Sequence, residues 1–231
     1  MNRAARRALD RAAQGLFPAF EQAGPFAGQE ATPPLLVDAL GQCFEICQQA
    51  DAAEAALPEE DVNELGSHAL ECLSDLGLWA YQLKLDDTRA DLEDLALDVA
   101  QWVTRHGGRI SVLEPVVNSL ARQANATRDP AVLSDLFERA LAVISHVAPG
   151  LSGEPGQQEP WRTLHFNGAI IATRIGVLER MNAAFDLLEG NLPEYCAAFY
   201  QEGLRETLKD SYSADVRETM RARLAKWTTR D

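Results

Sequence analysis

The sequence predicts an all-α protein in which antiparallel helical hairpins stack as an α/α superhelix. Apolar residues recur at steps of three and four along most of the chain, and this spacing gives a helix one buried face. The period-two alternation that is typical of strands is missing from the sequence. Proline and glycine occur where these helices would begin and end, so the chain divides into segments of ordinary helical length.

Ten helices are expected, and local signals set their boundaries. Thr32 before Pro33 is an N-cap followed by a proline in the first turn, where a proline removes no hydrogen bond. Asp129 before Pro130 repeats this arrangement. The predicted helices span about 3–22, 34–55, 59–84, 89–106, 112–126, 130–148, 160–174, 177–189, 193–209 and 213–228.

Further signals mark other helix ends. Pro58 precedes three acids, which suit the positive end of a helix dipole. Thr88 with Asp91 resembles a capping pair, and Ser213 is placed to cap the last helix. Gly176 could break the span 160–189, which leaves open whether this span is one helix or two.

The stretch 104–118 combines a histidine, two glycines and a glutamate, and it is predicted to be a corner between helices. The glycine pair 107–108 suits the left-handed turn that ends a helix. Ser111 and Glu114 match the S-x-x-E capping box of the next helix. The alternative is a catalytic pair of His106 and Glu114, which lacks a visible third member.

The predicted organisation is an N-terminal amphipathic helix at 1–22, a linker at 23–34 and a helical-repeat domain at 35–231. Whether the N-terminal helix packs on the rest is left open. Its apolar stripe must be covered by something, and a homodimer through the first two helices is one hypothesis. The stripe consists of Leu9, Ala12, Leu16, Phe17 and Phe20.

The charge of the chain is unevenly distributed. The net charge is −14, and the segment from Glu45 to Asp98 holds fifteen acids against only Lys84 and Arg89. Such a field repels nucleic acid and anionic membranes, and it favours a basic partner. The alternative is a solvated surface that keeps the protein soluble.

The apolar runs, the N-terminus and the cysteines of the sequence all suggest a protein of a reducing compartment. No run of apolar residues is long enough to span a bilayer, and the N-terminus does not resemble a secretory signal, so we expect a cytoplasmic protein. The four cysteines, at 43, 47, 72 and 196, are expected to be buried free thiols. They lack the spacing of a zinc site, and no metal or cofactor is expected.

Motifs of known enzyme chemistry are missing from the sequence. It contains no P-loop, dinucleotide fingerprint, H-E-x-x-H, nucleophile elbow or EF-hand loop. Enzymatic activity is therefore uncertain and less expected than a binding role.

A loose repeat is visible. Thr-Arg recurs at 104–105, 127–128 and 173–174, with intervals of 23 and 46 residues. A helix with its turn takes about 23 residues and a hairpin about 46, which is typical of stacked hairpins.

Apolar positions of successive predicted helices are spaced so that neighbouring helices can pack on one another. They are Leu92, Leu95, Ala96, Val99 and Trp102, packed against Val116, Val117 and Leu120, then Leu133, Phe137, Ala140 and Ile144. On these residues the chain resembles, from about 62 to 209, the tetratricopeptide-like α/α helical repeat superfamily, and Trp161, Leu164 and Gly168 echo the start of one such unit. The resemblance implies binding of a peptide or protein on a concave face.

The function hypothesis is a protein-interaction module that binds a basic or amphipathic segment. Trp79 lies one position off the main apolar stripe of its helix, so we expect it to be an exposed anchor. The acidic binding face would consist of Glu59, Glu60, Asp61, Glu64 and Glu71.

A second hypothesis is an all-α pocket protein that binds a small apolar ligand or acts as an enzyme. Its pocket would lie near Trp102, His106 and Trp161.

Overall fold

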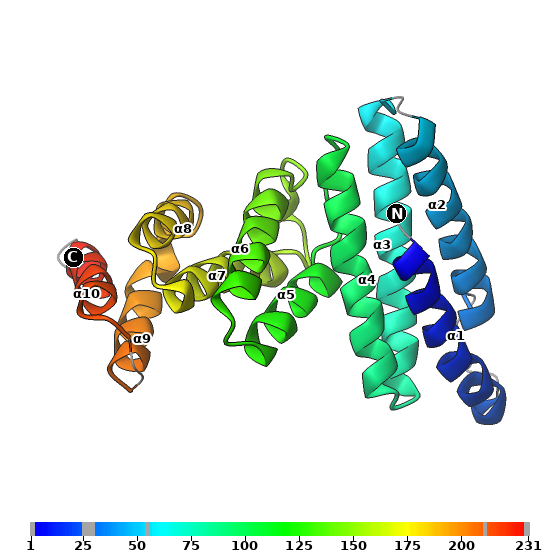
Figure 1. Cartoon of the computed structure of the whole chain (residues 1–231), viewed down its shortest axis with the longest axis horizontal. Coiled ribbons are helices and arrows are strands. Elements are labelled where there is room, and N and C mark those ends of the chain that lie inside the picture. The colour runs from blue at the N-terminus through cyan, green and yellow to red at the C-terminus, as the bar shows by residue number, and fades with distance from the viewer. Residues whose placement is uncertain (1–2, 25–30, 54–55, 210–211, 229–231) are drawn as a thin grey trace. The chain divides into compact units, whose positions relative to one another are not determined.

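The computed structural model describes residues 3–24, 31–53, 56–209 and 212–228, and these residues form helices and no strand (Figure 1). The all-α prediction is confirmed. Parts of the predicted linker (25–30), of the second predicted helix (54–55) and of the predicted repeat domain (210–211 and 229–231) lie outside the described residues.

The helices are α1 (Arg3–Ala23), α2 (Pro33–Ala53), α3 (Glu59–Gln82), α4 (Asp86–Arg105), α5 (Glu114–Ala126), α6 (Pro130–Ser145), α7 (Gln158–Ile175), α8 (Leu178–Asn191), α9 (Cys196–Lys209) and α10 (Ala214–Thr228), with short 3₁₀ turns η1 (Leu151–Gly153) and η2 (Pro193–Tyr195).

Several predicted helix ends are confirmed. The Asp129 carboxylate accepts a hydrogen bond of 2.8 Å from the backbone N–H of Ala131, and the Ser213 hydroxyl accepts one of 3.2 Å from that of Val216. Gly176 has a φ of 74° and divides the span that the sequence left open into α7 and α8.

Two predicted caps are wrong. The Ser111 hydroxyl shares a hydrogen bond of 2.6 Å with the Ser67 hydroxyl, and α5 begins only at Glu114, so no capping box forms. Thr88 lies inside α4, which begins at Asp86. In both cases a short motif matched, but α5 begins two residues after its predicted start and α4 three residues before its predicted start.

Contacts between Cα atoms divide the chain into two compact units. The first unit comprises residues 1–120 and 145–157, and the second comprises 121–144 and 158–231. The sequence treated everything from 35 onward as one domain. No helix in the described ranges is long and apolar enough to cross a bilayer.

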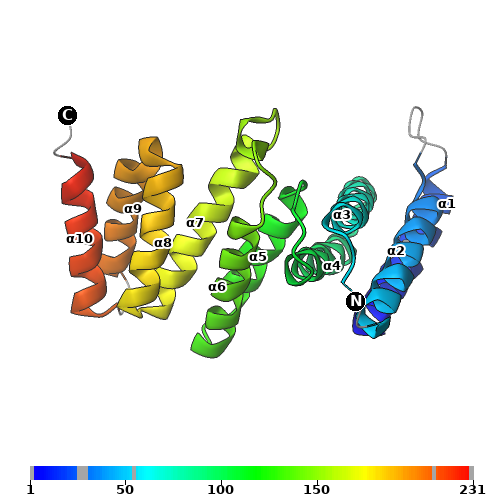
Figure 2. The same ribbon diagram turned by 90° about the horizontal axis from the view of Figure 1, so that it is seen from above.

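The first unit contains α1 to α4 packed as a closed ring of neighbours. Helix α1 contacts α2 and α4, and α3 also contacts α2 and α4 (Figures 1 and 2). Leu9 and Leu16 of α1 have no exposed surface. The N-terminal helix is thus part of this bundle: Leu9, Ala12 and Leu16 of its apolar stripe are buried, and Phe17 and Phe20 are half-buried. The homodimer through the first two helices stays a prediction.

Helices α3 and α4 approach each other closely at two glycines. A Cβ on Gly66 would lie 2.3 Å from Cγ2 of Val103, and one on Gly108 would lie 2.5 Å from Cγ1 of Val62. Real Cβ atoms do not come this close to a neighbour, so hydrogen is the side chain that this packing accepts at both positions.

The stretch 104–118 is a corner, as predicted. Gly107 has a φ of 75°, and the N–H of Gly108 donates to the carbonyl of Val103 at 3.0 Å, which is the Schellman ending of a helix. Beyond it, the N–H of Ile110 donates to the carbonyl of His146 at 2.8 Å. This bridge anchors the segment after α4 within the first unit.

The second unit consists mainly of the hairpins α7/α8 and α9/α10 (Figure 2). Arg174 of α7 donates to the carbonyls of Ala124 and Thr127 at the end of α5, where cations suit the negative end of the dipole. Arg180 of α8 donates to the hydroxyl of Ser134 on α6. Arg174 therefore connects the α7/α8 hairpin to the end of α5, and Arg180 connects the same hairpin to α6.

A buried carboxylate connects α8, α9 and α10. The side chain of Glu189 is 8% exposed, and it accepts hydrogen bonds from Tyr200 at 2.9 Å, from Arg223 at 3.0 Å and from Lys226. Burial by itself would raise the pKa of Glu189, but these hydrogen bonds outweigh burial and lower that pKa to about 2.

The two glycines of α3 give a matched pair of stability predictions. Gly66→Ala should lower the free energy of unfolding by about 1–3 kcal/mol, because the methyl group meets Val103. Gly77→Ala should raise it by about 0.5–1 kcal/mol, because a Cβ there meets nothing within 4 Å and alanine is the better helix former. Urea unfolding of both variants measures the difference, and equal effects would contradict the close approach of α3 and α4.

Glu189 predicts a pH dependence of stability. Its pKa is lowered from 4.5 to about 2, so its contribution is fully present above pH 4.5 and is lost as the pH falls toward 2. Glu189→Gln should lower the free energy of unfolding at pH 7 by up to about 3 kcal/mol, and the difference from wild type should vanish in acid. Glu218→Gln, at an exposed ion pair of α10, is the control and should have no such effect.

Candidate functional site

One side of α3 carries a line of exposed carboxylates that ends in an apolar residue. A helix turns once every 3.6 residues, so positions 60, 64, 71, 75 and 78 lie on one face over a length of about 27 Å. We call this face the α3 stripe, and all five of its side chains are exposed. They are Glu60, Glu64, Glu71, Asp75 and Leu78.

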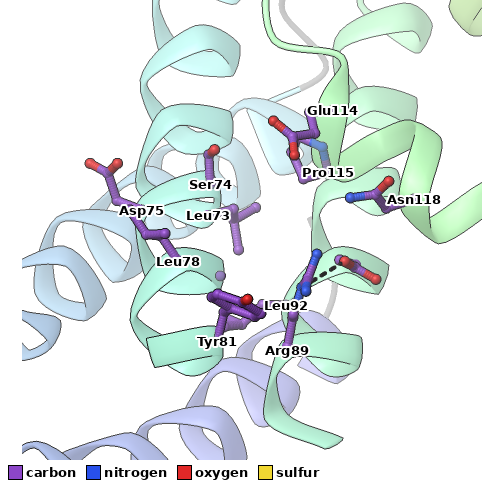
Figure 3. Close-up of a pocket in the computed structure, with 12 residues that line it drawn as sticks. Leu73, Ser74, Asp75, Leu78, Tyr81, Arg89, Leu92, Glu114, Pro115 and Asn118 are labelled. Carbon is purple, nitrogen blue, oxygen red and sulfur yellow. Dashed lines mark ion pairs between the residues drawn. The ribbon is translucent and has the colours of Figure 1, made fainter. Parts of the chain in front are cut away.

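A groove of about 350 Å³ adjoins the C-terminal end of the α3 stripe (Figure 3). We call it the α3 groove. The buried side chains of Leu73 and Leu92 belong to its lining, and the more exposed Leu78 and Tyr81, 49% and 63% exposed, lie at its edge. Glu114 and Asn118 of α5 line it as well. The groove therefore combines an apolar surface with carboxylate and amide groups.

Among the residues that the structure describes, Arg89 is the one basic residue in the lining of the α3 groove. Its guanidinium lies 3.2 Å from the carboxylate of Glu93 and 5.6 Å from the centre of the Tyr81 ring, and Figure 3 shows the ring and the guanidinium facing each other. The Tyr81 ring thus lies beside a cation and is 63% exposed, so its surface is available to a ligand.

The carboxylates of this surface are mostly uncompensated. Within the described ranges, Asp75 and Glu114 in the groove have no ion-pair partner, and neither do the three glutamates of the α3 stripe. Like charges at such spacing repel each other and destabilise a helix by a few tenths of a kcal/mol per pair. The surface thus carries negative charge that has no cationic partner within the described ranges, and a cationic ligand would neutralise it.

The predicted acidic face is partly brought together. Glu60, Glu64 and Glu71 lie on the α3 stripe, and Asp61 is exposed beside it. Glu59 lies apart from them, because its carboxylate pairs with Arg109 at 3.5 Å.

The prediction that Trp79 is an exposed anchor is wrong. Trp79 is 3% exposed, its ring meets Phe20 edge-on at 5.2 Å, and its indole N–H donates to the carbonyl of Ala31. Helix α3 packs against both α2 and α4, so its buried face is wider than a single apolar stripe and includes position 79.

Trp102 and His106 form a structural contact with Asp51. Trp102 has no exposed surface, and its indole N–H donates to the Asp51 carboxylate at 3.0 Å. The Nε2 of His106 lies 2.9 Å from the same oxygen, so the partner of this histidine is Asp51 and not Glu114. Neither residue lines the α3 groove.

Trp161, the third residue of the pocket hypothesis, belongs to the second unit. Its ring lies 4.1 Å from that of His165, whose Nδ1 contacts the Trp161 carbonyl at 3.0 Å. Burial lowers the pKa of His165, so its neutral form is favoured.

Sequence reasoning missed Leu78, Tyr81, Arg89, Asp75 and Glu114 as members of one site. A signal for Leu78 was present, because it continues the spacing of the acids rather than that of the apolar stripe. The convergence of Arg89 and Glu114 had no such signal, since α4 and α5 reach the groove only through the packing of the bundle.

The cysteines behave as predicted. All four are free and buried. Burial raises the pKa of Cys47 to about 12 and that of Cys72 to about 11, so both thiols stay protonated at neutral pH. No group of three or more possible metal ligands is found among the described residues.

Comparison of the chain with protein-family models, with curated proteins and with solved structures finds no match. The candidate site is therefore interpreted from its own geometry.

Neutralising the α3 stripe should not destabilise the protein. The variant Glu64→Gln, Glu71→Gln, Asp75→Asn should unfold at the same or a slightly higher urea concentration than wild type, because repulsion worth about 0.2–0.5 kcal/mol per pair is removed. A clear loss of stability would mean that these carboxylates have structural partners.

Proposed function

We propose that the first unit is a non-enzymatic protein-interaction module whose α3 stripe and α3 groove bind a basic, amphipathic segment of a partner protein. The carrying observation is the line of exposed carboxylates that have no cationic partner among the described residues and that leads to half-exposed Leu78 and exposed Tyr81. Lysine or arginine side chains of the segment would neutralise the stripe, and an apolar side chain would cover Leu78 and Tyr81.

The charge of this surface also indicates which ligands it disfavours. Nucleic acid and anionic membranes are unfavourable ligands for this surface, because they carry charge of the same sign. The cytoplasm remains the proposed compartment. The helical-repeat description remains a proposal for the second unit, and the successive hairpins α7/α8 and α9/α10 support it.

Peptide binding to the full chain tests the proposed function. The probe is a fluorescein-labelled helical peptide of roughly eighteen residues with one leucine face and one lysine face. The variant Glu64→Gln, Glu71→Gln, Asp75→Asn should bind it at least about tenfold more weakly at low salt, and added salt should weaken binding to wild type. Fluorescence polarisation measures the dissociation constant.

The control carries the same change of charge elsewhere in the first unit: Glu21→Gln, Asp38→Asn, Glu154→Gln, all at exposed positions. It should keep most of the affinity. Equal losses in both variants, or equal binding of a peptide with glutamate in place of lysine, would reject the docking face.

The apolar end of the site is tested by a second matched pair. Leu78 and Ile46 are each 49% exposed, but only Leu78 lines the α3 groove. Leu78→Ser should weaken binding of the same peptide by about tenfold, whereas Ile46→Ser should leave it unchanged. Indistinguishable affinities would show that the groove is not part of the binding surface.

A further inference from the structure

A second groove lies in the second unit between α7 and α9, and Met220 of α10 also lines it. We call it the α7–α9 groove. Its volume is about 680 Å³. Pockets that bind small molecules in proteins have volumes of about 300–1,000 Å³, so the groove is of the size that such a ligand fills.

Three aromatic residues form a cluster in the lining of the α7–α9 groove. The ring of Phe166 lies 5.1 Å from that of Phe199 and 6.2 Å from that of Tyr195. Phe199 in turn meets the rings of Phe185 and Tyr200 edge-on, and these two side chains have no exposed surface. Because the core holds Phe199 in place, the cluster is formed before any ligand arrives, and another ring can pack on it.

The apolar part of the α7–α9 groove is short. On α7 it extends from Phe166 to Ile170, which is about 6 Å along the helix. Polar residues line the groove before this part, at 162–163, and after it, at 173–174. A partner helix uses apolar anchors spread over about seven residues, or about 10 Å, which is longer than this part. A compact molecule made of rings matches the shorter length.

The charged residues of the lining leave the α7–α9 groove without net charge. Among the described residues they are two of each sign: Arg162, Arg174, Glu202 and Glu206. The two glutamates pair with Arg205 and Lys209, which lie outside the lining. Arg162 pairs with Glu159, and Arg174 donates to backbone carbonyls at the end of α5. A charged ligand would therefore lose hydration without meeting a free counter-charge.

The buried hydroxyls of the lining are also satisfied within the protein. Thr173 donates to the carbonyl of Ala169 at 2.8 Å, and Thr207 donates to that of Leu204 at 2.9 Å. These groups make no demand on a ligand for a hydrogen bond, so the surface that remains to be covered is apolar.

We infer that the α7–α9 groove binds a compact, uncharged small molecule made of aromatic rings, which packs on the aromatic cluster and on Ile170. Affinity comes from the apolar surface that the ligand and the groove remove from water. The ligand is of the class that the sequence suggested for a pocket near Trp102, His106 and Trp161, but none of these three residues lines the groove. The site is independent of the α3 stripe.

Two fluorescent probes with the same ring system test the inference on the full chain. Phenylnaphthylamine is uncharged, and anilinonaphthalene sulfonate adds one sulfonate to it. In fluorescence titrations the uncharged probe should bind with one-to-one stoichiometry, and the sulfonate should bind at least about tenfold more weakly. Equal or tighter binding of the sulfonate would overturn the uncharged ligand class, and failure of both probes to bind would overturn the site.

A matched pair of variants locates the probe. Ile170 is 45% exposed and lines the groove, whereas Val177 is 43% exposed and does not. Ile170→Lys should weaken binding of phenylnaphthylamine by at least about tenfold, because it brings a charge into the apolar part. Val177→Lys should leave binding unchanged. Equal affinities of the two variants would overturn the inference.

A second pair tests occlusion without a change of charge. Ala198 and Gln201 are both exposed on α9, but only Ala198 lines the groove. Ala198→Trp should fill the groove and abolish binding of the probe, and Gln201→Trp should not. Full binding to Ala198→Trp would mean that the probe lies elsewhere.

Two further measurements separate this site from the α3 groove and from a helical partner. Leu78→Ser should bind phenylnaphthylamine as wild type does, so either proposal can fail without the other. The helical peptide used for the α3 stripe should not displace the probe. Displacement by the peptide, or loss of the probe from Leu78→Ser, would overturn the inference.

Discussion

The candidate site depends on the close approach of α3 and α4. Gly66 and Gly108 remove the two Cβ atoms that would hold these helices apart, and the valines opposite fill the space. With one side of α3 fixed against α4 and another against α2, the remaining side must face water. The α3 stripe is that side, so the packing of apolar residues determines where the acids can act.

Carboxylate side chains have two different roles in this protein. Glu189 is buried, and its charge is stabilised by hydrogen bonds from three helical side chains, which makes it part of the structure. The carboxylates of the α3 stripe are exposed and lack ion-pair partners within the described ranges. Charge that is neutralised inside the molecule contributes to folding, whereas charge left uncompensated on a rigid surface is available for recognition.

The α3 groove joins a small apolar surface to a row of carboxylates, so electrostatic attraction would dominate there and salt would weaken it.

The sequence by itself determined the all-helical class, the caps at Asp129 and Ser213, the left-handed turn at Gly107 and the concentration of acid between 45 and 98. These features follow from neighbouring residues, whose spacing and φ preferences act locally. Only the tertiary structure decided that Trp79 is buried, that α1 to α4 close into a ring, and that Arg89 and Glu114 meet at one groove. Those outcomes depend on which helix faces approach each other, and side chains far apart in the sequence set that choice together.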